Sequence, residues 1–393
     1  MPRSLFAVVF LPVLALCAVV AGCSGDDVAL GDGGPRMDGS SGDGGRSDAG
    51  IRRDAGPPCV VALPVDILWV IDNSDSMAEE QANLTANFGV LTDVLTNPPD
   101  TNRDGMPDYP AVDDIRMAVV TTDLGVAPVT GVIGCEDPDG DDGVMVSASR
   151  ATDVGCAGHT IGPPPWLSYV APADPAAFSA EFACIGRLGT NGCGLERQLE
   201  AALRALTDKA AAGQPNEGFI RPDSLVVVIW VTDEEDCSAS DTAIYDPSPA
   251  ARTMYGSYGT RCANHPELMQ PVSRYIMGLR NLVFERPGGI VVAAITGVPS
   301  ELTANPLAID YDALLADSRM QYTPDPMDPN QLTPACQLGG AGKAIPARRI
   351  VSVVKDFADT GQGLVQSICQ VDFRPSLEAI GRLIGGRLCA PPI

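Results

Sequence analysis

Four short apolar runs, rich in β-branched residues, most constrain what this chain can fold into. They span residues 66–71, 115–122, 225–232 and 290–296. Each run is apolar almost throughout and does not alternate with polar residues, which is typical of strands that are covered on both faces. Such strands occur in parallel sheets, because the crossover connections of a parallel sheet place helices on both sides. The runs therefore predict the centre of a parallel sheet.

Apolar residues at helical spacing follow these runs in four places. The sets are Met77, Leu84, Phe88, Leu91 and Leu95; Leu195, Leu199, Leu203 and Leu206; Ile350, Val353, Val354 and Phe357; and Leu377, Ile380 and Ile384. Spacings of three, four or seven residues place each set on one face of a helix. Ser76 and Glu79 have the pattern of a capping box that opens the first helix. The alternation of strands and helices predicts an α/β fold with a doubly wound, mainly parallel sheet flanked by helices.

Long polar stretches interrupt this alternation and predict insertions into the domain. They are rich in proline, several contain cysteine, and they span residues 98–113, 124–183, 235–264 and 298–345. A chain of 393 residues can bury one sizeable core and still carry such insertions. We expect the folded domain to cover residues 59–393.

The N-terminal segment has the features of an export signal. Arg3 precedes an apolar run at 5–22, and Val20-Ala21-Gly22-Cys23 resembles the bacterial lipobox, whose cysteine receives lipid. We therefore expect a lipoprotein signal peptide at 1–22 and a lipid on Cys23 that anchors the chain to the bacterial cell envelope. The residue after Cys23 is Ser24 and not aspartate, which is similar to lipoproteins that are released to the outer membrane. An ordinary secretory signal and a short transmembrane anchor are the alternatives.

The segment that follows the lipobox predicts a linker. Residues 24–58 are rich in glycine, aspartate, serine and arginine and contain no aromatic residue. Such a segment buries too little apolar surface to offset the entropy lost on ordering. We expect residues 23–58 to be disordered and to span roughly 30–35 Å on average.

The net charge of −24 limits the classes of partner. So acidic a chain is repelled by phosphate backbones, which argues against a nucleic-acid partner. It attracts divalent cations, which prefer oxygen ligands. Much of this charge is also consistent with a solvated acidic surface that keeps the protein soluble.

Cysteine usage agrees with export. Of 12 cysteines, Cys17 lies in the predicted signal peptide and Cys23 in the lipobox. The even number that remains predicts disulfides, and the absence of a CxxC motif argues against a clustered zinc site. From proximity in sequence we expect bridges between Cys184 and Cys193 and between Cys237 and Cys262. A bridge from Cys59 to Cys389 would join the two ends of the domain.

Hard oxygen donors follow two of the predicted strands. Asp72, Ser74 and Ser76 come directly after the first run, and Asp233 and Glu234 come directly after the third run. Because ligands bind beyond the carboxyl ends of the strands in an open parallel sheet, we expect these side chains to meet at one edge. The alternative is that Asp72 and Ser76 cap the first helix and that Asp233 caps a loop.

The pattern Asp72-x-Ser74-x-Ser76 after a buried strand resembles the metal-ion-dependent adhesion site of von Willebrand factor A domains. The resemblance covers roughly residues 60–390, with large insertions. It implies a doubly wound sheet, with a divalent cation at the carboxyl ends of its strands. It also implies a threonine before a middle helix, which Thr190 supplies ahead of a helix expected to begin near Gly194, and an aspartate after the fourth strand, which Asp233 supplies.

The resemblance also implies a mode of action. The ion would be Mg²⁺, or Ca²⁺ or Mn²⁺, held by two serine hydroxyls directly and by Asp72, Thr190 and Asp233 directly or through water. A protein partner would complete the metal with an acidic residue. We therefore expect a lipid-anchored module for adhesion or scaffolding in the cell envelope.

A second acidic pattern predicts a structural Ca²⁺ site. Asp100, Asn102, Asp104 and Asp108 occupy positions 1, 3, 5 and 9 of a loop that has Gly105 at position 6, as in EF-hand-like calcium loops. The bidentate glutamate at position 12 is absent, because Val112 stands there. An acidic turn without metal is the alternative.

A structural envelope protein and a phosphatase-like hydrolase are the alternative functional classes. A structural envelope protein could use the metal for stability alone. A phosphatase-like hydrolase would need a second aspartate where Ser74 stands, so it lacks its general acid. The chain has only two histidines, His159 and His265, and no GxSxG, HExxH or P-loop motif. The sequence therefore favours a binding protein over an enzyme.

Overall fold

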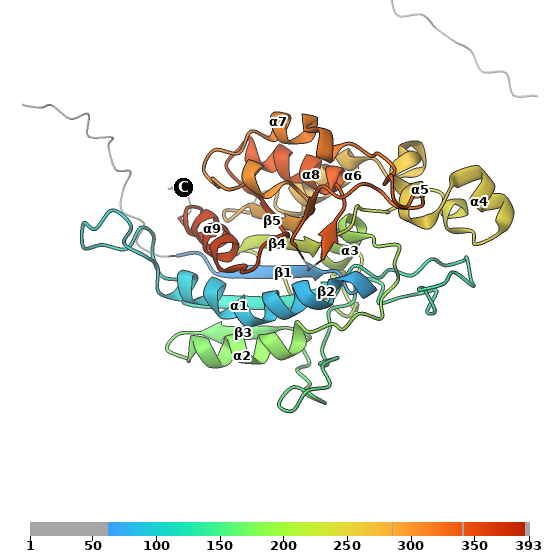
Figure 1. The fold of residues 1–393 in the computed structure, drawn as a ribbon. Coiled ribbons are helices and arrows are strands. Elements are labelled where there is room, and N and C mark those ends of the chain that lie inside the picture. The colour runs from blue at the N-terminus through green and yellow to red at the C-terminus, as the bar shows by residue number, and fades with distance from the viewer. Residues whose placement is uncertain (1–61, 285, 340–341, 390–393) are drawn as a thin grey trace, which may run out of the picture. The chain divides into compact units, whose positions relative to one another are not determined.

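A six-stranded sheet forms the centre of the domain in the computed structural model, which describes residues 62–284, 286–339 and 342–389 (Figure 1). The strand order is β3-β2-β1-β4-β5-β8, and every neighbouring pair is parallel except β2 and β3. The strands are β1 Val65–Ile71, β2 Asp114–Thr121, β3 Leu167–Val170, β4 Leu225–Thr232, β5 Ile290–Thr296 and β8 Gly363–Ser367. Two short strands, β6 Cys336–Gln337 and β7 Lys343–Ala344, form a separate antiparallel pair.

The predicted mainly parallel sheet is confirmed. All residues of β1, β4 and β5 are buried, as their continuous apolar runs predicted. The edge strands β3 and β8 were not predicted. Strand β3 lies within the expected insertion at 124–183 and alternates buried and exposed residues over four positions, while β8 is only five residues long. Short edge strands carry a much weaker hydrophobic signal than central ones.

Helices cover both faces of the sheet (Figure 1). On one face lie α1 Ala78–Thr96, α2 Pro175–Ile185 and α9 Arg374–Gly385; on the other lie α3 Gln198–Leu206, α6 Val272–Leu282, α7 Tyr311–Ala316 and α8 Arg348–Ala358. Alternate residues of β1 enter opposite cores, so that Trp69 packs with Phe88 of α1 on the first face and Leu68 packs on the second. The doubly wound α/β arrangement follows from this two-sided burial.

The remaining elements belong to the long connections. These are the helices α4 Pro249–Tyr255 and α5 Tyr258–Asn264 and the 3-10 helices η1 Asp75–Met77, η2 Thr242–Tyr245, η3 Pro266–Leu268, η4 Ser300–Leu302 and η5 Ser318–Met320. The connection after β4 shares a small core with the loop after β2 and the segment before α3, and this core includes Tyr245 and the Cys237–Cys262 disulfide. None of the helices in the described ranges is long and apolar enough to span a membrane.

Four disulfides join described cysteines: Cys135–Cys193, Cys156–Cys184, Cys237–Cys262 and Cys336–Cys369. The predicted Cys237–Cys262 bridge is confirmed, and the predicted Cys184–Cys193 bridge is wrong. Cys193 turns away from the end of α2, because its backbone N–H donates to Asp123 Oδ2 at 3.1 Å in the loop after β2. The predicted signal peptide, lipidated Cys23, linker and Cys59 lie outside the described residues.

Candidate metal centre

The pairing of β1 with β4 brings two distant segments to one edge of the sheet. The strands are parallel with Ile71 opposite Val231, and the backbone N–H of Asp72 donates to the carbonyl of Val231 at 2.9 Å. Asp72 follows β1, and Asp233 follows β4. Both carboxylates therefore leave the sheet at the same edge, as the sequence predicted for this pair.

Hydrogen bonds connect the side chains of the two segments. Ser76 Oγ donates to Asp233 Oδ1 at 3.2 Å, although 157 residues separate them, and Ser74 Oγ lies 3.2 Å from Ser76 Oγ. The backbone N–H of Ser74 donates to Asp72 Oδ1 at 2.8 Å. Asp72 and Asp233 are buried, whereas Ser76 is exposed. The four side chains thus form one group of oxygen atoms that reaches from the end of the sheet to solvent.

The orientation of Asp72 is fixed by residues that the sequence did not single out. Thr232, the last residue of β4, donates from Oγ1 to Asp72 Oδ2 at 2.6 Å. Gln198, at the start of α3, donates from Nε2 to Thr232 Oγ1 at 2.9 Å. The Asp72 carboxylate is therefore held by the Ser74 backbone and by Thr232, which Gln198 orients in turn, and it has little freedom to turn away from the group.

The structure places the loop of Thr190 beside Asp72, although not its hydroxyl. Gln81 of α1 donates from Nε2 to the carbonyls of both Asp72, at 2.7 Å, and Gly189, at 2.9 Å. Thr190 is partly exposed, and no hydrogen bond joins its side chain to another residue of the described ranges. The helix that follows begins at Gln198 and not near Gly194, so this part of the prediction was wrong.

The capping alternative is also wrong for Ser76. Helix α1 begins at Ala78 after the 3-10 helix η1, and its N-cap position is Met77, with no side-chain hydrogen bond. Ser76 therefore lies in η1 rather than at the cap, and its hydroxyl bonds to Asp233 instead. The predicted capping box with Glu79 does not form, because the 3-10 turn shifts the N-cap by one residue, from Ser76 to Met77.

Burial and mutual repulsion disfavour the charged forms of the acids at this edge. Burial raises the pKa of Asp72, and burial together with Glu234 and Asp72 raises the pKa of Asp233 well above its usual value. Burial, Asp72 and Glu234 likewise raise the pKa of Glu196. Neither Asp72 nor Asp233 forms an ion pair with a basic side chain of the described residues. A bound cation would supply the missing positive charge.

Glu196 and Glu234 are functional candidates that the motif did not identify. Glu196 is buried in the irregular segment before α3, and burial followed by Asp72 raises the pKa of Glu234 to about 8. In the described part of the chain, no three His, Cys, Asp or Glu side chains lie close enough to hold a metal. The oxygen donors at the strand ends are instead two carboxylates and two hydroxyls, a set suited to Mg²⁺ that keeps several waters.

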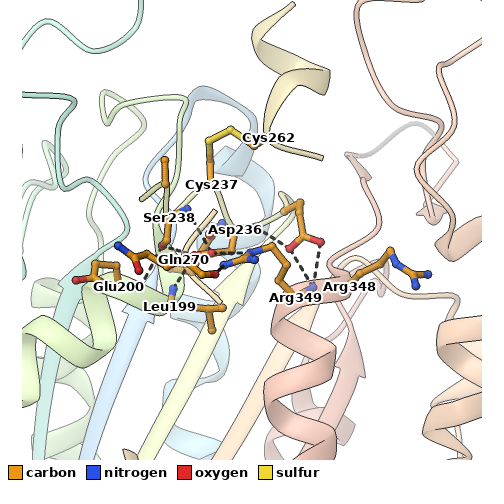
Figure 2. Close-up of polar contacts among 12 residues, drawn as sticks. Leu199, Glu200, Asp236, Cys237, Ser238, Cys262, Gln270, Arg348 and Arg349 are labelled. Atoms are coloured by element: carbon orange, nitrogen blue, oxygen red, sulfur yellow. Dashed lines mark hydrogen bonds and ion pairs between the residues drawn. A yellow bond between two sulfur atoms is a disulfide. The ribbon is translucent and has the colours of Figure 1, made fainter. Parts of the chain in front are cut away.

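A buried ion pair between Asp236 and Arg349 stabilises the segment after Asp233. Asp236 accepts hydrogen bonds from the Leu199 N–H at 2.9 Å and from Ser238 Oγ at 2.7 Å, and Arg349 Nε lies 3.1 Å from its Oδ2 (Figure 2). Arg349 also donates to the carbonyl of Gln270, whereas Arg348 points away. These contacts tie the starts of α3 and α8 to the end of β4, so Asp236 has a structural role.

The predicted calcium loop is a tight turn held by its own side chains. Asp100 accepts from the backbone N–H groups of Asp104, at 3.1 Å, and Gly105, at 2.9 Å. Asn102 accepts from the N–H of Asp104 at 2.9 Å, and Asp108 accepts from the Thr101 hydroxyl at 2.7 Å. Asp100 is partly exposed, and the other residues of the turn are exposed. The geometry resembles an acidic turn, and calcium at this loop stays a prediction.

Comparison with known proteins gives little further information. No family model matches the chain, and no curated protein matches it. Among solved structures, it is similar to proximal thread matrix protein 1 of the mussel byssus, with 11% identity, 62% of this chain and 39% of that chain covered, and a TM-score of 0.29. It is also similar to the pilus adhesin RrgA of Streptococcus pneumoniae, with 14% identity, 49% of this chain and 23% of that chain covered, and a TM-score of 0.20. The chain thus spans well under half of either protein, and TM-scores this low carry no argument about function.

Proposed function

We propose that this chain is a metal-dependent binding module of the von Willebrand factor A type. Asp72, Ser74, Ser76 and Asp233 would hold a divalent cation, Mg²⁺ or alternatively Ca²⁺ or Mn²⁺, and Thr190 would approach it from the adjacent loop. The partner would be a protein that offers a carboxylate. The proposal includes anchoring to the bacterial cell envelope through a lipid on Cys23.

The contact between Ser76 and Asp233 is the observation that carries the proposal. It joins the two segments that the motif requires, at 3.2 Å, beyond neighbouring parallel strands. The alternative, that Ser76 caps the first helix, does not explain its contact with Asp233.

The residues at the strand ends fit a hard divalent cation. Two hydroxyls and two carboxylates supply oxygen donors, and the buried carboxylates lack a basic partner among the described residues. When bound, the cation would offer a Lewis-acidic position to an incoming carboxylate. Thr232 and Gln198 would keep Asp72 oriented toward it. The exposed Ser76 would leave one side open to the partner.

Calorimetric titration of the full-length protein with Mg²⁺, Mn²⁺ and Ca²⁺ tests the metal site. We expect Ser74→Ala to weaken binding roughly tenfold or more, because it removes a donor hydroxyl. Ser147→Ala, which removes an exposed hydroxyl outside the group, is the matched control and should bind as the unaltered protein does.

A pull-down from envelope extract, with and without chelator, tests the binding function. Asp72→Ala should abolish capture of the partner while circular dichroism stays unchanged. Equal capture with and without chelator would contradict the proposal. A gain in stability with metal, but no partner, would instead favour a structural envelope protein.

A further inference from the structure

A cavity of about 190 Å³ lies next to the proposed metal site. Its lining comes from the segment before α3, the segment after β4, helix α5 and two later loops. Glu196, Glu234 and Glu235 contribute carboxylates. Leu195, Leu332 and Ile345 contribute apolar walls. Gly194 and Gln331, which also line it, are exposed, so the cavity reaches solvent.

The carboxylates of this cavity differ in their partners. Glu235 is satisfied, because it accepts from the Tyr322 hydroxyl and from the Arg349 backbone N–H at 3.0 Å. Glu196 is only 4% exposed, yet its side chain accepts no hydrogen bond from any other described residue. The side chain of Glu234 likewise accepts none. A buried carboxylate without a donor from another residue is costly, so a guest that donates a hydrogen bond to Glu196 would stabilise it.

No lysine or arginine of the described chain lines the cavity. Lys343 attracts Glu234 electrostatically, but it is exposed and lies outside the lining. The lining thus carries three carboxyl groups and no basic side chain, which favours a cationic guest. Because the cavity is much larger than one ion needs and has apolar walls, it suits a side chain with an aliphatic stem and a charged end.

We propose that this cavity receives a lysine or arginine side chain of the protein partner. The stem would pack on Leu195, Leu332 and Ile345, and the charged end would bond to Glu196 and Glu234. Glu234 follows Asp233 directly, so the cavity and the proposed cation are neighbours. The partner would place a lysine or arginine side chain in the cavity and a carboxylate on the cation. That pairing rests on the proposed function, whereas the cationic character of the guest rests on the cavity alone.

Methyl NMR of the full-length protein tests this assignment, with N-acetyl-lysine methylamide as the probe. The same titration with N-acetyl-norleucine methylamide supplies the apolar stem without the charge. In the presence of EDTA, we expect the lysine probe to shift the methyl signals of Leu195, Leu332 and Ile345, and the norleucine probe to leave them in place. Equal shifts from both probes, or no shift from either, would overturn the proposal.

Glu196→Gln removes the charge and keeps the volume, so it should weaken binding of the lysine probe roughly tenfold. Glu217→Gln, an exposed glutamate outside the lining, is the control and should bind normally. Unchanged affinity of a folded Glu196→Gln variant would count against the proposal. If that variant does not fold, the comparison of the two probes still decides.

Titration with Ca²⁺ alone separates a second metal site from a side-chain pocket. Ca²⁺ that shifts the cavity methyls, while the lysine probe does not, would overturn the proposal in favour of a metal. The probe titrations contain no free divalent ion. If Asp72 and Asp233 do not bind a metal, the results of these titrations are therefore unchanged. The two proposals can therefore fail independently.

Discussion

Gly192 shows how closely the candidate site depends on single residues. Its backbone N–H donates to the carbonyl of Asn73 at 2.8 Å, and a Cβ added to it would lie 2.3 Å from Asn73 Oδ1. Asn73 stands between Asp72 and Ser74, so a side chain at 192 would force the Asn73 amide to shift within the loop that carries both proposed ligands. We expect Gly192→Ala to weaken Mg²⁺ binding roughly tenfold, measured by calorimetric titration.

Gly194→Ala is the matched control for this substitution. A Cβ at Gly194 would come no closer than 3.9 Å to the nearest atom, Glu196 Oε1, so metal affinity should stay unchanged. Equal affinities for the two variants would show that the loop does not support the metal site.

Individual site residues could be predicted where they follow a strand with a strong signal. Asp72 and Asp233 each end an apolar run, so the topology of a parallel sheet was enough to bring them together. Glu196 lies in an irregular segment, and its burial results from long connections whose packing no local pattern encodes. Thr232 could not be assigned either, because a threonine that ends a strand gives no sign of the carboxylate it holds.

At the scale of elements, the central strands and main helices were predictable and the long connections were not. Strand β3 and helix α2 were expected to be part of an insertion, yet they complete the edge of the sheet. Proximity in sequence also predicted Cys184 to pair with Cys193. It failed because the loop after α2 leads Cys193 to the loop after β2, whereas Cys184 stays at the end of the helix.

The Cys237–Cys262 disulfide should stabilise the connection after β4. It closes a loop with a sequence separation of 25 and lies in the small core that this connection shares with the loop after β2 and the segment before α3. We expect the double variant Cys237→Ala/Cys262→Ala to lose about 3 kcal/mol of unfolding free energy, since the unfolded chain gains conformational freedom. Urea denaturation measures the loss.

Cys156→Ala/Cys184→Ala provides the comparison, because that bridge has a similar separation of 28 but joins partly exposed cysteines. If closure of the loop dominates, the two losses should agree within about 1 kcal/mol. An unchanged midpoint for the Cys237 and Cys262 variant would contradict a stabilising role.

At the scale of the whole molecule, the excess of acidic residues is unevenly compensated. At the start of β1, buried Asp66 pairs with Arg221, whose Nη2 lies 2.7 Å from its Oδ1. At the opposite end of the same strand, Asp72 has no such partner within the described residues. The net charge could be read from the sequence, but its distribution required the topology. The end of the sheet with uncompensated carboxylates is also the end that carries the motif.

This distribution predicts an unusual pH dependence for the metal-free protein. The pKa of Glu234 is raised from 4.5 to about 8, and the pKa of Glu196 is raised well above its usual value. Between pH 5 and 8, the folded state therefore holds more protons than the unfolded state, and raising the pH must destabilise it. We expect stability in EDTA to fall by up to about 1.4 kcal/mol per pH unit for each extra proton held.

Thermal unfolding at pH 5, 6.5 and 8, in EDTA and in Mg²⁺, measures this dependence. Glu196→Gln should reduce the slope in EDTA, since it removes one titrating group, and Glu217→Gln should not. Because Mg²⁺ competes with protons for the site, it should raise the melting temperature more at pH 8 than at pH 5. Stability that rises with pH in EDTA would mean that these carboxylates are compensated in the folded state, and a cation would then have no deficit of charge to fill.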